Sequence, residues 1–172
     1  MATIVTQEAT PAWSGSRLAH LRQRSQGIFE QLATVPGVQG ACLCDNQGEI
    51  LGMLLTATGD RRLFERIGLA LSQCLAALSK LSPLTNIELR FERKLVIARD
   101  LGNALVVVLC STAANTAVLR MALEVAANPF EGDADLQHDL RQVAPSRSSV
   151  FGREHLDASA QHLLLKAGLK EP

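Results

Sequence analysis

The sequence predicts an α+β fold, in which helices pack on a mostly antiparallel sheet of five short strands. Three observations lead to this class. Apolar residues recur at helical spacing in three separate segments. Between these segments lie apolar or alternating runs of strand length. Short turns that contain glycine join neighbouring runs, as in β-hairpins. The resulting order is α-β-β-α-β-β-β-α over residues 16–128, which we expect to form one domain.

The first helix is expected to follow a flexible arm over residues 1–15 and to end at Pro36-Gly37, because proline disfavours helix in the residue before it. Two small apolar runs, residues 38–45 and 49–56, then flank the turn Asn46-Gln47-Gly48. This pattern predicts a hairpin. Both faces of each run are apolar, so we expect the hairpin to be covered on both sides.

The second helix is expected to begin with Asp60 as its N-cap and to run to about Leu81, before Ser82-Pro83. Its apolar positions span roughly 160° of the helix circumference, whereas a surface helix normally buries about 100°. The excess predicts that part of this arc packs on the sheet and part on something else. The other cover is either a second molecule or the chain's own terminal helices.

Three more strands and a helix complete the predicted domain. Residues 87–92 alternate strictly between apolar and charged side chains, which indicates one buried and one wet face. Residues 95–98 and 104–110 form two further strands around the turn at Gly102-Asn103. Asn115 is the predicted cap of a third helix, which ends at Asn128-Pro129. The expected apolar face of this helix comprises Val118, Leu119, Ala122 and Val125.

Residues 129–172 differ in character from the domain. An acidic cluster opens the segment, and a linker-like stretch follows at residues 145–149. The segment ends in an expected amphipathic helix with Leu156, Ser159, Ala160, Leu163, Leu164 and Ala167 on its apolar side. Such a helix either folds back on its own domain or docks on a partner.

Composition excludes several classes of protein. The seventeen basic and seventeen acidic residues balance, and aromatic residues make up 3 % of the chain. Neither property suits a nucleic-acid-binding protein. No run approaches the roughly 18 apolar residues of a membrane span, and no secretory signal is recognisable, so we expect a cytoplasmic protein. The predominance of arginine over lysine is typical of a GC-rich bacterial genome.

The sequence shows no convincing catalytic set, and we expect no enzyme and no cofactor. Neither a GxGxxG nor a GxxxxGK[ST] phosphate loop occurs. The four histidines fall outside the predicted sheet. The four cysteines lie in apolar surroundings without a CxxC spacing, which favours buried, reduced thiols over a metal site.

Basic residues gather in two places. Arg61, Arg62 and Arg66 lie at the start of the second helix, and Arg90, Arg93 and Lys94 lie at the turn after the third strand. Exposed arginines can bind a nucleotide phosphate or an acidic partner. An ordinary solvated surface, where single charges contribute little, is the more common explanation for such clusters.

The chain resembles the Roadblock family, which comprises dynein light chains and small-GTPase scaffolds, over about residues 32–128. The resemblance lies in the turn Val35-Pro36-Gly37-Val38, the hairpin Gly40–Ile50 with its Asp45-Asn46-Gln47-Gly48 turn, and the order of the later strands. The expected sheet is accordingly Roadblock-like or profilin-like. The segment after Asn128 is not covered by the resemblance.

The resemblance implies a homodimer, in which the second helices pack across the symmetry axis and the third strands pair edge to edge. The residues expected at this interface are Leu63, Phe64, Ile67, Leu71, Cys74, Leu75, Leu78, Ile87 and Leu89. It also implies a non-catalytic scaffold or regulator that binds a Ras-like small GTPase or a larger assembly. The alternative is a small-molecule sensor built on a similar profilin-like or PAS-like sheet.

Overall fold

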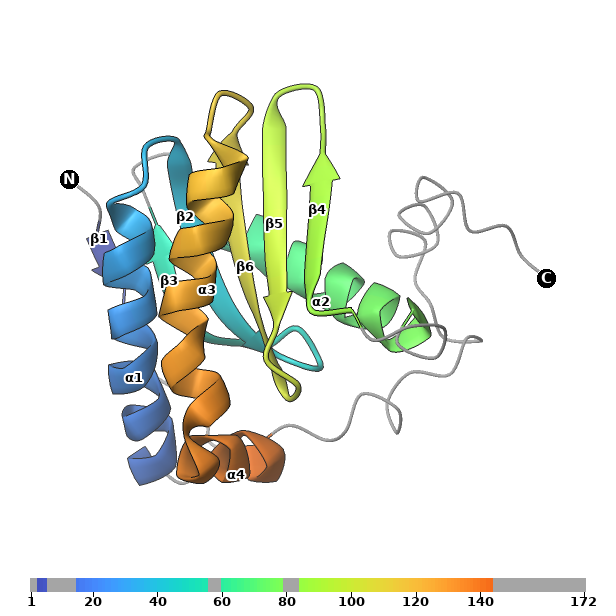
Figure 1. Cartoon of the computed structure of the whole chain (residues 1–172). Helices are drawn as coiled ribbons and strands as arrows, with labels where there is room; N and C mark the ends of the chain where they lie inside the picture. Colours follow the sequence, from blue (N-terminus) through green and yellow to red (C-terminus); the bar gives the residue numbers. More distant parts are fainter. Residues whose placement is uncertain (1–2, 6–14, 56–59, 79–83, 144–172) are drawn as a thin grey trace.

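The computed structural model describes residues 3–5, 15–55, 60–78 and 84–143, and it contains an antiparallel sheet with helices on both faces (Figure 1). The helices are α1 (Gly15–Ala33), α2 (Arg61–Leu78), α3 (Thr116–Gly132) and α4 (Ala134–Val143). The strands are β1 (Thr3–Val5), β2 (Val38–Asp45), β3 (Ile50–Leu55), β4 (Asn86–Arg90), β5 (Lys94–Asp100) and β6 (Ala104–Ser111). The predicted α+β class and order of elements are confirmed.

The strands lie in the order β1-β3-β2-β6-β5-β4, and every neighbouring pair is antiparallel. Strand β1 is an addition to the five predicted strands. It lies in the segment expected to be a flexible arm and pairs with β3, from Thr3 opposite Leu55 to Val5 opposite Met53. Its three residues are β-branched and so suited to a strand, but the run is too short for a pattern to reveal.

Two separate cores lie on the two faces of the sheet. This agrees with the sequence pattern, in which both faces of the strands are apolar. Along β5, Leu95 and Ile97 belong to one core, and Val96 and Ala98 belong to the other. Helices α1, α3 and α4 cover the first face, and of the described helices only α2 lies on the second (Figure 1). On that second face, α2 contributes Phe64, Leu71 and Leu75 to the core.

Helix α3 differs from the prediction in its buried face and in its end. Val118 and Val125 are 44 % and 58 % exposed, and the buried residues are Leu119, Leu123, Ala126, Ala127 and Phe130. The helix continues through Pro129 to Gly132. Phe130 is buried in the core, and its carbonyl accepts a hydrogen bond from the Gln137 side chain at 2.9 Å. These contacts hold the last turn despite the proline.

Helix α4 extends the core beyond Asn128. Leu136 and Leu140 are buried in the core that α1 and α3 form. Asp133 accepts hydrogen bonds from the backbone amides of Asp135 and Leu136, at 3.1 and 3.0 Å, as a helix cap does. Part of the acidic cluster thus begins a helix. The linker-like residues 145–149 and the helix expected over residues 156–167 lie outside the described residues.

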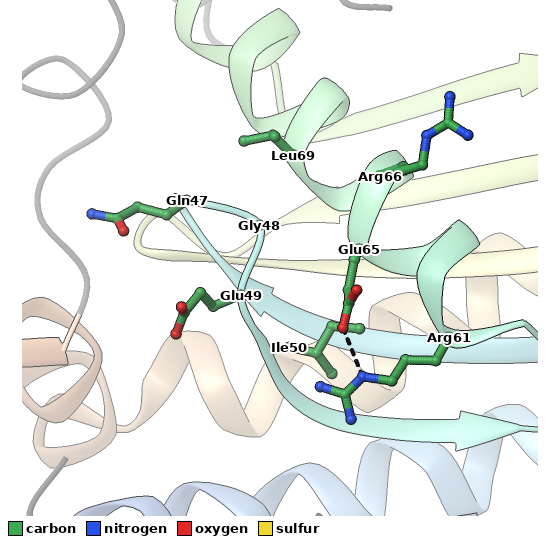
Figure 2. A pocket seen from close by; sticks show the side chains of 8 residues that line it. All are labelled: Gln47, Gly48, Glu49, Ile50, Arg61, Glu65, Arg66 and Leu69. Atoms are coloured by element: carbon green, nitrogen blue, oxygen red, sulfur yellow. Dashed lines mark hydrogen bonds and ion pairs between the residues drawn. The ribbon is translucent and has the colours of Figure 1, made fainter. Parts of the chain in front are cut away.

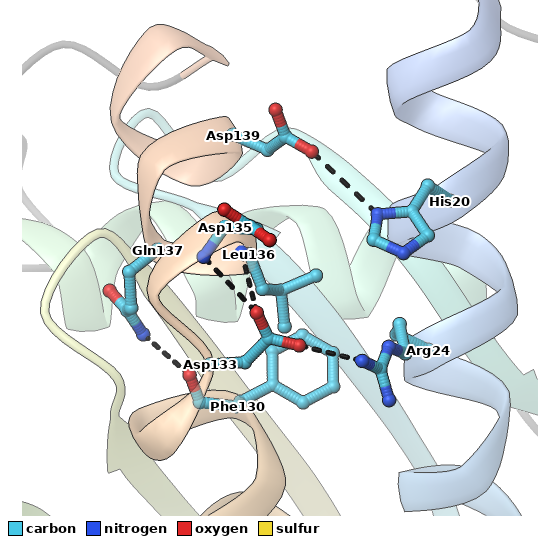
Figure 3. A network of polar contacts seen from close by, with 8 residues as sticks. All are labelled: His20, Arg24, Phe130, Asp133, Asp135, Leu136, Gln137 and Asp139. Atoms are coloured by element: carbon cyan, nitrogen blue, oxygen red, sulfur yellow. Dashed lines mark hydrogen bonds and ion pairs between the residues drawn. The ribbon is translucent and has the colours of Figure 1, made fainter.

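Two side-chain contacts join α4 and its cap to α1 (Figure 3). The Arg24 guanidinium lies 2.6 Å from the Asp133 carboxylate, and His20 Nδ1 lies 3.6 Å from Asp139. The hydrogen bond from the Leu136 amide, together with the charge of Arg24, lowers the pKa of Asp133. Both causes favour the ionised form of this cap, which is the form that pairs with Arg24.

The β2–β3 turn is organised by one buried carboxylate. Asp45 Oδ1 accepts hydrogen bonds from the amides of Gln47 and Glu49, at 2.8 and 2.9 Å. Gly48 has a φ of +82°, and a Cβ placed there would lie 2.7 Å from the Leu69 backbone, so the turn packs directly on α2. Burial raises the pKa of Asp45 above its ordinary value, against the lowering effect of these hydrogen bonds.

We expect Asp45→Ala to lower the free energy of unfolding by about 1–3 kcal/mol, because two amides of the turn lose their acceptor. Asp45→Asn is the matched control, since its carbonyl oxygen can accept the same bonds. Because the pKa of Asp45 is higher in the folded than in the unfolded chain, the parent protein loses stability as the pH rises from the unfolded to the folded pKa of this group. Urea denaturation should therefore show the Asp45→Asn variant gaining stability relative to the parent between acidic and neutral pH. Equal losses for both variants would contradict this role.

Gly27 provides a second test of the packing. It lies in the interior of α1, and a Cβ placed there would meet nothing within 4 Å. Gly27→Ala should raise the free energy of unfolding by about 0.5–1 kcal/mol, through helix propensity alone. Thermal denaturation measures the change, and a loss of stability would show that another atom occupies this space.

Candidate functional site

Two incompletely covered apolar surfaces lie on the second face of the sheet, one at the free edge of β4 and the other on the flank of α2. Among the described strands, β4 pairs with β5 only. Ile87 and Leu89 on β4 and Ile67 on α2 are half-buried beside the second core. Leu63 on α2 is 38 % exposed. An unpaired strand edge next to incompletely buried apolar side chains is a surface that can associate with another chain.

The residues predicted for the dimer interface divide into two groups. Leu63, Ile67, Leu78, Ile87 and Leu89 are exposed or half-buried. In contrast, Phe64, Leu71, Cys74 and Leu75 are buried within the single chain, and Phe64 is 0 % exposed. Phe64, Leu71 and Leu75 face the sheet. A substitution at any of these three would disturb folding before it reported on association.

The first predicted basic cluster lies beside the β2–β3 turn (Figure 2). Arg61 and Arg66 line a hollow of about 360 Å³, together with Gln47, Gly48, Glu49, Ile50, Glu65 and Leu69. Arg61 Nε lies 2.6 Å from the Glu65 carboxylate, so part of its charge is already satisfied. Arg62 and Arg66 are exposed. The hollow therefore offers acidic as well as basic groups to an incoming ligand.

The second basic cluster lies at the opposite end of the sheet. Lys94 is opposite Ser111 at the end of β6 and donates a hydrogen bond to Gln39, near the start of β2. Asp45, by contrast, ends β2 beside the first cluster. Arg90 pairs with Glu88 at 3.1 Å, and Arg93 is exposed. The two clusters thus do not form one site, although one large partner could contact both.

Glu88 connects β4 to α3. Its carboxylate pairs with Arg120 of α3 as well as with Arg90. The hydrogen bond from Arg120 is the main cause of the lowered pKa of Glu88. Because Glu88 points to the α3 side, the apolar Ile87 and Leu89 point to the α2 side. The alternation predicted for this strand therefore separates a charged face from an apolar one.

A further apolar surface was missed by the sequence argument. Val118, Met121 and Val125 of α3 are exposed, and Met121 is 68 % exposed. They line a groove of about 720 Å³ between α1 and α3, which Gly27 and Val35 also border. The pattern had assigned Val118 and Val125 to the core, because apolar spacing alone does not show which side of a wide stripe is buried.

The described residues offer little for chemistry. They contain no group of three or more histidine, cysteine or acidic side chains placed to hold a metal ion. Burial raises the pKa of the Cys110 thiol to about 12 and that of Cys42 well above its ordinary value, so neither is a nucleophile near neutral pH. In the same part of the chain, no helix combines the length and apolar character that crossing a membrane requires.

Comparison with protein-family models and with curated proteins finds no match. Solved structures do match. MglB of Myxococcus xanthus superimposes with a TM-score of 0.58 at 10 % identity, over 75 % of this chain and 96 % of that one. The gliding protein MglB of Thermus thermophilus gives 0.56 at 15 % identity, over 78 % and 99 %. A Roadblock/LC7 domain from Streptomyces avermitilis gives 0.50 at 13 % identity, over 62 % and 92 %. The chain therefore has the Roadblock/LC7 fold.

Proposed function

We propose that the protein is a non-catalytic scaffold or regulator that forms a homodimer and binds a Ras-like small GTPase. The observations that carry the dimer are the free edge of β4 and the incompletely buried apolar side chains of β4 and α2 on the same face of the sheet. In a dimer with two-fold symmetry, β4 of one copy pairs with β4 of the other. The apolar patch of one copy then packs on the same patch of its partner. This pairing would satisfy the free backbone groups of β4 and cover Leu63, Ile67, Ile87 and Leu89.

The GTPase partner is supported by the family that the sequence resembles and by the fold. The exposed arginines at either end of the sheet offer a second, weaker support, because they could pair with acidic groups of a protein partner. The sensor alternative gains no support, since the described side chains fill both faces of the sheet.

Leu63→Glu tests the dimer without touching the core, because this side chain is 38 % exposed. A carboxylate buried at the interface without a partner should raise the dimer dissociation constant at least about tenfold. Val125→Glu is the matched control, because Val125 is 58 % exposed and lies on α3, on the opposite face of the sheet. Sedimentation equilibrium of both variants gives the constants. An unchanged constant for Leu63→Glu would exclude this interface.

The partner is tested with a purified small GTPase from the same genome, loaded with GDP or with a GTP analogue. We expect binding to one nucleotide state to be tighter, as measured by calorimetry. Arg66→Glu and Arg93→Glu, tested separately, should identify the contacting cluster by a loss of about tenfold in affinity. Arg141→Glu, an exposed residue of α4, is the control. Absence of binding in both states would contradict the regulator function.

A further inference from the structure

The backbone pairing of β4 with β5 shows which groups of β4 face outward. The Phe91 amide donates to β5 at one end of the strand, and the Thr85 carbonyl accepts from β5 at the other, both at 2.8 Å. In an antiparallel ladder, hydrogen-bonded pairs of residues alternate with pairs that are not bonded. Every second residue between Thr85 and Phe91 therefore bonds to β5 as well. The residues between these have backbone groups that point away from β5, and they are Asn86, Glu88 and Arg90.

Two of these outward residues carry opposite charges on one face of the strand. Glu88 pairs with Arg90 of β4 and with Arg120 of α3. The hydrogen bond from Arg120 lowers the pKa of Glu88, so its carboxylate is ionised at neutral pH. The Arg90 side chain is 59 % exposed and accessible to a second chain. An acidic and a basic residue two positions apart make this edge complementary in charge to an antiparallel copy of itself.

The other face of the strand carries a row of apolar side chains. Ile87 and Leu89 are half-buried beside the second core. Phe91, which still bonds to β5, is 38 % exposed. These three side chains share a face, because side chains alternate along a strand. Leu89 is at the centre of the row, so a second copy that covers the row must bring apolar side chains to both sides of Leu89.

We propose that β4 pairs with β4 of a second copy in the antiparallel register that places Leu89 on the two-fold axis. The inference rests on the proposed dimer and specifies how its two strands meet. Opposite residues of antiparallel strands point to the same face, so one residue of β4 faces its own copy across the axis. With Leu89 there, Glu88 of each copy faces Arg90 of the other. Ile87 of each copy likewise faces Phe91 of the other.

Registers centred on neighbouring outward residues match the side chains less well. With Glu88 on the axis, two carboxylates face each other, and like charges directly opposite destabilise a sheet. The same repulsion arises with Arg90 on the axis. With Ile87 on the axis, Glu88 faces Asn86 and meets no basic side chain of the other copy.

The count of backbone hydrogen bonds favours a different register from the side chains. Centring on Glu88 pairs all three outward residues, whereas centring on Leu89 pairs two of them, Glu88 and Arg90. The outward groups that stay unpaired in the dimer remain bonded to water, so each additional backbone bond contributes little. We therefore expect the charge pairs and the apolar row to select Leu89.

Single cysteines in β4 identify the residue on the axis. Leu89→Cys should form a disulfide between the two copies under oxidised glutathione, because the equivalent residues face each other. Leu89 would lie in a pair that is not hydrogen-bonded, with Cα atoms about 4.5 Å apart, which is within the usual span of a disulfide. Ile87→Cys and Glu88→Cys are the matched controls. In this register their equivalent residues are offset along the strand by two residues or more, so neither should cross-link at a comparable rate.

The natural thiols are accounted for by the parent protein. Cys42, Cys44 and Cys110 are 0 % exposed, and Cys74 is 4 % exposed. Parent protein treated with the same oxidant shows whether any of them cross-links. Each variant is oxidised at a concentration where sedimentation shows it to be a dimer, and non-reducing electrophoresis measures the yield.

Charge reversal tests the contact between Glu88 and Arg90 independently. Arg90→Glu brings an acidic side chain opposite each Glu88 and should raise the dimer dissociation constant at least about tenfold at low salt. Glu88→Arg should weaken the dimer similarly. An equimolar mixture of the two variants places each charge opposite its counterpart again, so it should form a heterodimer of nearly parental affinity. Arg141→Glu, the same charge change on α4, is the control and should leave the constant unchanged.

The outcomes separate this inference from the proposed function. Cross-linking through Ile87→Cys or Glu88→Cys in place of Leu89→Cys would overturn the register and leave the dimer standing. A dimer that none of the three cysteines cross-links, or whose dissociation constant Arg90→Glu leaves unchanged, would overturn the register as well. If no cysteine cross-links and Leu63→Glu also leaves the constant unchanged, the proposed dimer interface itself is rejected.

Discussion

The whole structure depends on a sheet whose central strands are apolar on both faces. Strands β5 and β6 alternate between two cores, so neither face can be left in water. Of the described helices, three cover one face and α2 covers the other. On the second face, Ile87 and Leu89 of β4 are half-buried. A second molecule that pairs with β4 would bury these side chains further.

This imbalance links folding to the proposed function. Helix α2 serves the core with Phe64, Leu71 and Leu75, while its flank offers Leu63 and Ile67 to the outside. The same rigid element therefore anchors the sheet and presents the interface.

The sequence was sufficient for the fold class because each signal was local. The Asn46-Gln47-Gly48 turn, the alternation of residues 87–92 and the Asn115 cap each specify their element, and all three elements are present. The strand predicted over residues 87–92 ends two residues earlier, at Arg90. The errors have a shared cause. A wide apolar stripe does not show which side is buried, so Val118 and Val125 were assigned to the core. The continuation of α3 through Pro129 depends on Phe130 and Gln137, which are tertiary contacts. For the candidate site, the wide apolar arc of α2 indicated that the helix packs on something besides the sheet. It could not show which residues of the arc are buried in the core and which are exposed.

Hydrogen exchange of the β4 amides tests the central claim most directly, because it observes the strand edge itself. In an edge strand, amides that point to the neighbouring strand are protected and those that point outward exchange freely. We predict that the outward amides of β4 become protected as the protein concentration rises through the dimer transition, whereas the inward amides are protected throughout. If the outward amides exchange at the same fast rate in the dimer as in the single chain, the copies do not meet through β4, and the account is wrong.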